Sequence, residues 1–231
     1  MKSTFGLPTL LLLIGESATG KTQFKQTRLE PDGLFYNLRS ATTRPMRVKE
    51  GETEGNPYFF RDETYFESKE EPLATYLWVN EAIWNKTLLE KGKVIPKWLY
   101  GVPEREILDN LGRNLVYDVI QPCYATQMIK WFENHNLKND YNIKVAWFIP
   151  PENRGNVVKK RANMKNDKKV RDMNTCTALD ILRAGLTVDY MLCPREDISS
   201  APLDLYLLQL YNNMLFSREL EEKNQYYTHK K

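Results

Sequence analysis

The segment GESATGKT, residues 15–22, places a lysine and a threonine directly after two glycines that four residues separate. A glycine-rich turn of this spacing lets backbone N–H groups converge on phosphate oxygens, and the following helix points its positive dipole end at them. The lysine of such a motif bridges phosphates, and the hydroxyl of the threonine coordinates Mg²⁺. The pattern therefore predicts a site for a nucleoside triphosphate.

The residues around this motif have the order that a phosphate-binding loop needs, with an apolar stretch before it (9–14) and a helical pattern after it (21–27). A chance strand–turn–helix is the weaker interpretation. We expect ATP and Mg²⁺ as ligands, with Thr22 on the metal, Lys21 as a catalytic residue, and the nucleotide on Gly15, Glu16, Ser17, Ala18, Thr19, Gly20, Lys21 and Thr22.

A second basic motif, SATTRPMR, covers residues 40–47 and is followed by EGE at 50–52 and YFF at 58–60. Its arginines, Arg44 and Arg47, are three residues apart, and the proline after Arg44 restricts the chain between them. Two guanidinium groups so placed can form a fork for a dianion, to which Tyr58 adds a neutral donor. Isolated arginines are usually solvated, but after a phosphate loop this pair favours a second phosphate site.

In this order and at this distance, the two motifs resemble those of the guanylate kinase family, whose second motif reads S-x-T-T-R-x-P-R-x-G-E-x-x-G-x-x-Y-x-F. Here the proline directly follows Arg44, and two extra residues precede Tyr58. The resemblance implies that Ser40 contacts the base of an acceptor nucleotide. It also implies that Arg44, Arg47 and Tyr58 hold the phosphate of that acceptor.

The stretch Trp98-Leu99-Tyr100-Gly101 looks like the Y-G-[ST] element of the family, which places Tyr100 on the acceptor phosphate. The next residue departs from the family, because Val102 cannot donate the hydrogen bond that serine or threonine gives to the guanine carbonyl. The segment 61–98 is also longer than is typical. Glu81 and Glu90 are therefore both candidates for the guanine-reading glutamate, and the distance to Tyr100 favours Glu90.

Two further regions resemble the family. Asp118 ends an apolar stretch, 115–119, as the aspartate of the family's I-D-x-Q-G element does, and we expect it to contact the substrate. The basic residues near 159–171 match the family's lid, in which arginines neutralise the charge of the transferring phosphoryl group. This match makes Arg161 and Arg171 expected catalytic residues, and Lys165 stands where the family has another arginine.

Apolar segments that alternate with helical patterns predict an α/β fold with a central, mainly parallel sheet flanked by helices. We expect strands at 9–14, 33–37, 58–60, 114–119, 145–149 and 188–192, and helices at 21–27, 103–112, 124–134, 154–165, 170–184 and 203–223. The resemblance implies a P-loop NTPase fold in one domain. Its core would comprise 5–38 and 103–223, its nucleoside-monophosphate lobe 39–102, and its lid 154–172.

The composition fits a globular protein, since 42% of the 231 residues are hydrophobic and 27% are charged. A net charge of +3 is too small to indicate nucleic acid as a partner. Three cysteines without a CxxC pair predict reduced thiols and a cytoplasmic protein rather than a disulfide or zinc framework. No apolar stretch is long enough to predict a membrane span.

These patterns favour a kinase that transfers the γ-phosphate of ATP to GMP or dGMP. A kinase of the same fold with another acceptor, such as a different nucleoside monophosphate or a ribose bisphosphate, is the main alternative, because Val102 and the long 61–98 segment fall in the base-reading region. A non-catalytic guanylate-kinase-like interaction module is the other alternative. The intact phosphate motif argues against it.

Overall fold

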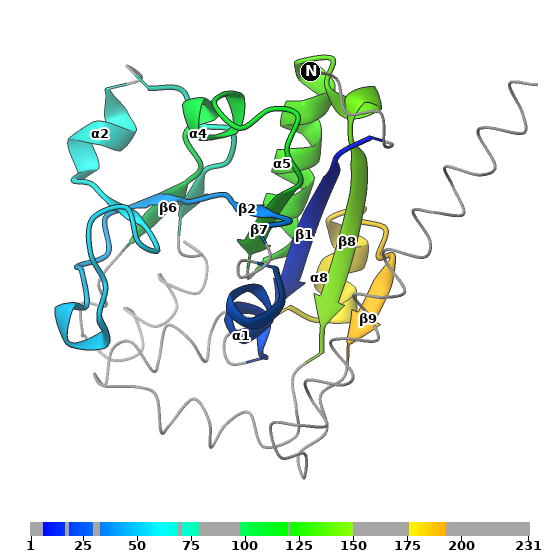
Figure 1. Ribbon diagram of the computed structural model, residues 1–231, viewed down its shortest axis with the longest axis horizontal. Coiled ribbons are helices and arrows are strands. Elements are labelled where there is room, and N and C mark those ends of the chain that lie inside the picture. Colours follow the sequence, from blue (N-terminus) through cyan, green and yellow to red (C-terminus); the bar gives the residue numbers. More distant parts are fainter. Residues whose placement is uncertain are drawn as a thin grey trace, which may run out of the picture.

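The computed structural model describes residues 7–16, 19–29, 33–68, 71–78, 98–119, 121–149 and 176–192. The larger of its two sheets has five strands, all parallel, and confirms the predicted α/β architecture (Figure 1). Their order across the sheet is β2 (Tyr36–Asn37), β7 (Leu115–Val119), β1 (Thr9–Gly15), β8 (Asn142–Phe148) and β9 (Tyr190–Leu192).

The central strand β1 is buried along all seven of its residues. Alternate side chains point to opposite faces of a strand, so this apolar run supplies two cores. Leu10, Leu12 and Ile14 pack on one face with α5 (Pro122–Asn134) and with Ile181 of α8 (Ala178–Arg183). The other face contributes Leu11 and Leu13, which pack with Phe24 of α1 (Lys21–Phe24) and with Leu29 of the π-helical turn Lys25–Leu29.

The second sheet has four short strands and lies beside the core (Figure 1). Its order is β4 (Phe59–Phe60), β3 (Ala41–Thr42), β6 (Leu99–Gly101) and β5 (Leu77–Trp78), and the chain between these strands forms a 3-10 turn (Val48–Glu50) and α2 (Glu63–Glu67). All of it falls within residues 39–102, where we expected the small lobe. The sequence analysis missed β3, β5 and β6, because two or three residues are too few to show alternation.

The described helices that the sequence predicts lie at the expected places, but their bounds differ from the predicted ones. The pattern at 103–112 corresponds to α4 (Glu104–Leu108), and the one at 124–134 begins two residues earlier, at the proline that opens α5. Within 170–184 the described helix is α8, which starts at a capping box formed by Thr177 and Asp180. The helices predicted at 154–165 and 203–223 lie outside the described residues, and no helix within the described ranges is long and apolar enough to cross a membrane.

A buried carboxylate links the core to the start of the lobe. Glu106 of α4 is 8% exposed and accepts hydrogen bonds from Arg39 Nε at 2.8 Å, from Arg39 Nη2 at 3.1 Å and from the Tyr36 hydroxyl at 2.9 Å. The Arg39 guanidinium also stacks on Phe59 of the lobe, 4.6 Å from the ring centroid. One carboxylate therefore fixes the chain between β2 and β3, which carries Ser40.

Glu106→Ala is expected to lower the free energy of unfolding by about 2 kcal/mol, because it leaves the Arg39 guanidinium and the Tyr36 hydroxyl without their acceptor. Urea denaturation followed by circular dichroism measures this loss. Asp109→Ala is the matched control, since Asp109 pairs with Arg105 on the same helical segment but both side chains are largely exposed. Its expected effect is below about 0.5 kcal/mol, and an equal loss in both variants would contradict the role of Glu106.

Candidate functional site

The chain turns at Gly15, where β1 ends and the phosphate motif begins. Gly15 has a φ of 142°, and a Cβ placed on it would lie 2.5 Å from the carbonyl oxygen of Phe148. Both facts require glycine. The motif then leads through Gly20, the N-cap position of α1, into Lys21. Its described residues thus lie at the carboxyl end of the central parallel strand, the position at which open α/β sheets bind ligands.

Lys21 is folded over this turn. Its Nζ donates to the carbonyl oxygens of Gly15 and Glu16, both at 2.7 Å, and lies 3.4 Å from the Thr19 hydroxyl oxygen. The Thr19 hydroxyl in turn donates to the Glu16 carbonyl at 2.9 Å. Lys21 is only 6% exposed, so its ammonium group lies against the motif and not in solvent. This is the position from which an ammonium group can bridge phosphate oxygens.

Asp118, at the carboxyl end of β7, faces the same motif. One carboxylate oxygen lies 3.9 Å from Lys21 Nζ, and the other lies 3.4 Å from Nζ of Lys25, which also donates to Asn37 Oδ1 at 3.1 Å. Asp118 is an expected substrate contact, and the structure places its carboxylate between Lys21 and Lys25. The sequence analysis missed Lys25, although the i, i+4 spacing from Lys21 puts both on one helical face.

Thr22 is the residue available to a metal ion. It is exposed in the first turn of α1, and its hydroxyl has no hydrogen-bond partner in the described part of the chain. A hydroxyl oxygen next to a phosphate site fits Mg²⁺, which prefers hard oxygen ligands and keeps several waters. Among the described residues, no three His, Cys, Asp or Glu side chains gather into a metal site. Ser17 and Ala18 lie outside the described residues.

Arg44 and Arg47 lie in the lobe and share one acidic partner. Arg44 is 5% exposed, and its guanidinium donates to both carboxylate oxygens of Glu52, at 2.7 and 3.0 Å. Glu52 also accepts the backbone N–H of Arg47 at 2.7 Å. Burial alone would raise the pKa of Glu52, but these hydrogen bonds and the nearby arginine charges hold it below its usual value. Glu52 therefore stays ionised and orients Arg44.

Tyr58 and Tyr100 complete this group, which we call the arginine clamp (Arg44, Arg47, Tyr58 and Tyr100). Their rings lie edge to face with centroids 5.9 Å apart, and the Arg44 guanidinium lies 5.2 Å from the Tyr58 ring. Burial raises the pKa of Tyr58, and the negative charge of Asp118 raises it further. Burial also raises the pKa of Tyr100, although Arg44 opposes that rise. Both hydroxyls therefore remain protonated donors.

Ser40 lies apart from the clamp, at the junction of lobe and core. Its hydroxyl oxygen is 3.3 Å from the hydroxyl of Tyr117, which is also 3.3 Å from the hydroxyl of Thr75. Val102, the departure from the family pattern, is fully buried in the main core, and its backbone N–H donates to Thr75 Oγ1 at 3.1 Å. The sequence analysis did not connect Thr75 or Tyr117 with Ser40, because hydroxyl residues far apart in the chain have no spacing signal.

The structure thus forms two groups from the described site residues. Gly15, Glu16, Thr19, Gly20, Lys21 and Thr22 gather with Asp118 at the end of β1, and the arginine clamp gathers in the lobe. The expected base-reading Glu90, its alternative Glu81, and the lid arginines Arg161 and Arg171 lie outside the described residues.

Comparison with known proteins finds guanylate kinases that are similar to this chain over part or most of its length. The guanylate kinase of Legionella pneumophila (strain Paris) is 27% identical over 217 residues, which cover 93% of this chain and 91% of that protein. The guanylate kinase of Rickettsia felis is 28% identical over 144 residues, 62% of each chain. The crystal structure of guanylate kinase from Anaplasma phagocytophilum has the same fold, with a TM-score of 0.53 at 18% identity over 92% of this chain and 87% of that one. No protein-family model matches the chain.

Glu52→Gln is expected to cost about 2 kcal/mol of unfolding free energy at pH 7, since it removes the charge that holds Arg44. Because the folded state lowers the pKa of Glu52, its contribution is complete above the ordinary value of 4.5 and is lost as the pH falls through the lowered pKa. The difference between wild type and variant should therefore shrink below pH 4.5 in urea titrations.

The control for this pH effect is Glu133→Gln, which removes an exposed partner of Lys138. It should change the unfolding free energy by less than about 0.5 kcal/mol at either pH. A loss in Glu52→Gln that is the same at pH 7 and pH 3 would show that shape, and not charge, accounts for it.

Proposed function

We propose that this chain is a member of the guanylate kinase family and an ATP-dependent kinase that transfers the γ-phosphate of ATP to GMP or dGMP, giving ADP and GDP or dGDP. The observation that carries the proposal is the presence of two cationic groups, one on the phosphate motif, where Asp118 pairs with Lys21 and Lys25, and one around Arg44 and Arg47. Two phosphate sites facing one another are what transfer between two nucleotides requires.

On the donor side, Lys21 would exchange the carbonyl oxygens that it now contacts for oxygens of the β- and γ-phosphates. Those phosphates would rest on the N–H groups of the motif, residues 15–22. Thr22 would hold Mg²⁺, which when bound offsets phosphate charge. Asp118 keeps Lys21 and Lys25 on this side, because its carboxylate lies within 4 Å of both ammonium groups.

On the acceptor side, the arginine clamp would bind the phosphate of the monophosphate. Arg44 already has its guanidinium plane fixed by Glu52, and Tyr58 and Tyr100 remain neutral donors. Two guanidinium groups and two hydroxyls can satisfy a dianion and hold its oxygen in line for attack. Ser40 would contact the base.

The remaining roles complete this reaction scheme. Arg161 and Arg171, in a lid at about 154–172, would neutralise the charge that spreads over the transferring phosphoryl group, and closure of the lid would exclude water. Glu90 would contribute to reading the base. The core would comprise 5–38 and 103–223, and residues 39–102 would form the acceptor lobe. We place the protein in the cytoplasm, without nucleic acid or membrane as a partner.

A panel of nucleoside monophosphates with ATP·Mg²⁺, followed by a coupled assay of ADP, tests the proposal. GMP and dGMP should have kcat/KM values at least about tenfold above those of AMP, CMP and UMP, a gap that one or two hydrogen bonds can provide. Equal rates on all five would favour a kinase with another acceptor. ATP binding without turnover on any acceptor would favour the non-catalytic module.

Arg44→Lys should raise KM for the acceptor at least about tenfold while KM for ATP changes less than about twofold, because lysine cannot form the bidentate contacts of a guanidinium. Arg61→Lys is the matched control, since Arg61 lies in the same lobe, pairs with Glu54 and is exposed. That control should leave both KM values within about twofold of wild type. If Arg44→Lys changed KM for ATP as much as KM for the acceptor, Arg44 would not be specific to the acceptor site.

A further inference from the structure

A second lysine beside the phosphate motif, Lys25, is held inside the protein by two polar groups. It follows the last residue of α1, one helical turn after Lys21, and is 8% exposed. Its Nζ donates to Asn37 Oδ1 at 3.1 Å and lies 3.4 Å from a carboxylate oxygen of Asp118. Helical side chains lean back over the turn that precedes them, so Lys25 extends toward the phosphate motif without belonging to it.

The two partners of Lys25 lie at the carboxyl ends of neighbouring strands. Asn37 is the last residue of β2, Asp118 is the last but one of β7, and these strands pair in parallel. Figure 1 shows α1 at this end of the sheet. Asn37 and Asp118 therefore hold the Lys25 ammonium group at the edge of the sheet where open α/β proteins bind their ligands.

The carboxylate of Asp118 lies between two ammonium groups. Its Oδ1 is 3.9 Å from Lys21 Nζ, and its Oδ2 is 3.4 Å from Lys25 Nζ. Two positive charges and one negative charge leave these three side chains with a net charge of +1. We call Lys21, Lys25 and Asp118 the lysine–aspartate triad.

The triad bears on ATP binding because Lys21 has to change partners. Its Nζ now donates to the carbonyl oxygens of Gly15 and Glu16 and pairs with Asp118. On the proposed function it turns to the β- and γ-phosphates, and Asp118 then shares Lys21 with a ligand that carries several negative charges. Asp118 is 19% exposed, so without another cation its carboxylate would be poorly solvated and would repel the phosphates.

Lys25 can remove this penalty because its own partners do not change. Asn37 accepts one of its three N–H donors, which leaves the others for the Asp118 carboxylate. A lysine that stays on Asp118 neutralises it whether Lys21 contacts the motif carbonyls or the phosphates. Lys25 would then act on the phosphates through Asp118 and not by touching them.

We propose that Lys25 is a positioning residue of the donor site, which keeps Asp118 neutralised and so releases Lys21 to the phosphates of ATP. This inference rests on the proposed function and adds to its donor side a residue that the phosphate motif, 15–22, does not include. It has a specific consequence. Loss of the Lys25 charge weakens ATP binding only while residue 118 is a carboxylate.

The test is Lys25→Met in the full chain, with the dissociation constant of ATP measured by titration calorimetry. The variant keeps most of the side-chain volume, and it should bind ATP about tenfold more weakly because one charge near the ligand is uncompensated. Adding Asp118→Asn to this variant should bring the dissociation constant back to within about threefold of wild type, since the net charge is again +1. EDTA in the buffer keeps any metal contact of Asp118 out of the comparison.

Two further variants distinguish the charge of Lys25 from its packing. Lys25→Arg keeps the charge and should bind ATP within about threefold of wild type. Lys25→Gln keeps a donor for Asn37 without the charge, so it should lose as much affinity as Lys25→Met, and it replaces that variant if Lys25→Met does not fold. The loss should be smaller for ADP, which carries fewer negative charges than ATP, whereas a packing defect would affect both nucleotides alike.

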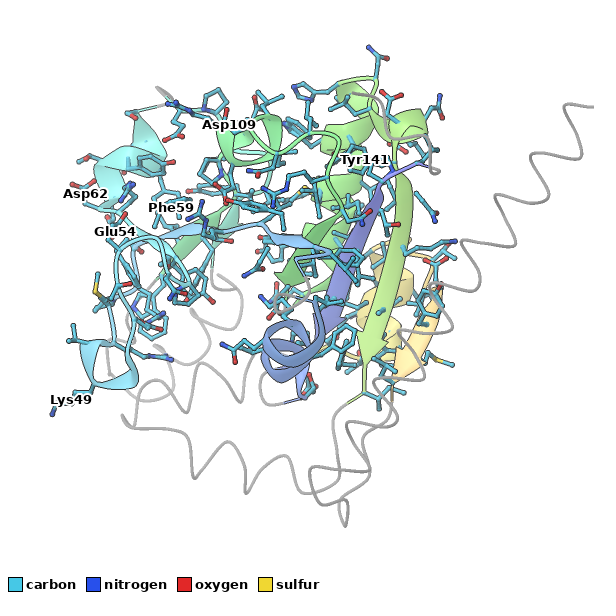
Figure 2. All side chains as sticks on the ribbon, viewed as in Figure 1. Lys49, Glu54, Phe59, Asp62, Asp109 and Tyr141 are labelled. Carbon is cyan, nitrogen blue, oxygen red and sulfur yellow. The ribbon has the colours of Figure 1, made fainter. Side chains whose placement is uncertain are left out.

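Lys144→Met is the matched control. Lys144 is also a partly buried lysine paired with an aspartate, since its Nζ lies 3.5 Å from Asp189. It is near the start of β8, at the end of the sheet that Tyr141 marks in Figure 2, opposite α1. The register places it beside Leu11, four residues from Gly15, or about 13 Å along the strand. This variant should bind ATP within about twofold of wild type.

The outcomes separate this inference from the proposed function. If wild type phosphorylates GMP, and folded Lys25→Met and Lys25→Gln bind ATP as tightly as wild type, the inference is overturned and the kinase assignment stands. The inference is also overturned if Asp118→Asn fails to restore binding, because Lys25 would then act by direct contact or by packing. If wild type binds ATP but phosphorylates no acceptor, and Asp118→Asn restores the loss in Lys25→Met, the kinase assignment fails and the inference stands. A wild-type protein that binds no ATP would overturn both.

Discussion

The burial of β1 on both faces is the constraint on which the other features depend. A strand flanked by parallel neighbours and covered by helices on both sides must be apolar at every position, and residues 10–14 are all leucine or isoleucine with no exposed surface. The end of this strand lies tightly against β8, because Gly15 pairs with Phe148 and a Cβ on Gly15 would lie 2.5 Å from the Phe148 carbonyl oxygen. The phosphate motif therefore begins at one defined position.

The pairing of β1 with β7 extends this control to the acceptor side. The register aligns Leu12 with Tyr117 and Leu13 with Asp118. Since consecutive side chains of a strand point to opposite faces, Asp118 lies with α1 and its lysines, and Tyr117 lies on the α5 face with Ser40 and Thr75. Two adjacent residues thus lie on opposite faces of the sheet and face different groups of residues. A shift of one residue in this strand would bring either Tyr117 into the place of Asp118 or Asp118 into the place of Tyr117, and would leave a valine in the other place.

The sequence predicted what depends on local spacing. The phosphate motif, the arginine pair and the strand before Gly15 each lie within a short continuous segment. The structure forms the turn and the central strand, and it places the arginine pair just after β3 of the second sheet. Contacts between distant segments were not predictable in the same way. The environment of Asp118 depends on the register of β7, and the proximity of Thr75 to Tyr117 depends on how a four-stranded sheet meets a five-stranded one. Neither of these two arrangements produces a periodic pattern in the sequence.

The separation of Ser40 from the arginine clamp has a physical reason that concerns selectivity. A guanidinium fork such as Arg44 binds any dianion strongly, so it gives affinity for every monophosphate and distinguishes none of them. Discrimination needs groups whose bonding is satisfied by one base and frustrated by another, and a buried hydroxyl facing the wrong polarity costs about as much as the hydrogen bond that it fails to make. The position of Glu106 matters for the same reason, because it fixes the chain that carries Ser40 toward Tyr117 and leads on to Arg44. On the proposed function, a rigid link between Ser40 and Arg44 would give the base of the acceptor a fixed location once its phosphate is bound, and recognition of the base depends on such a fixed location.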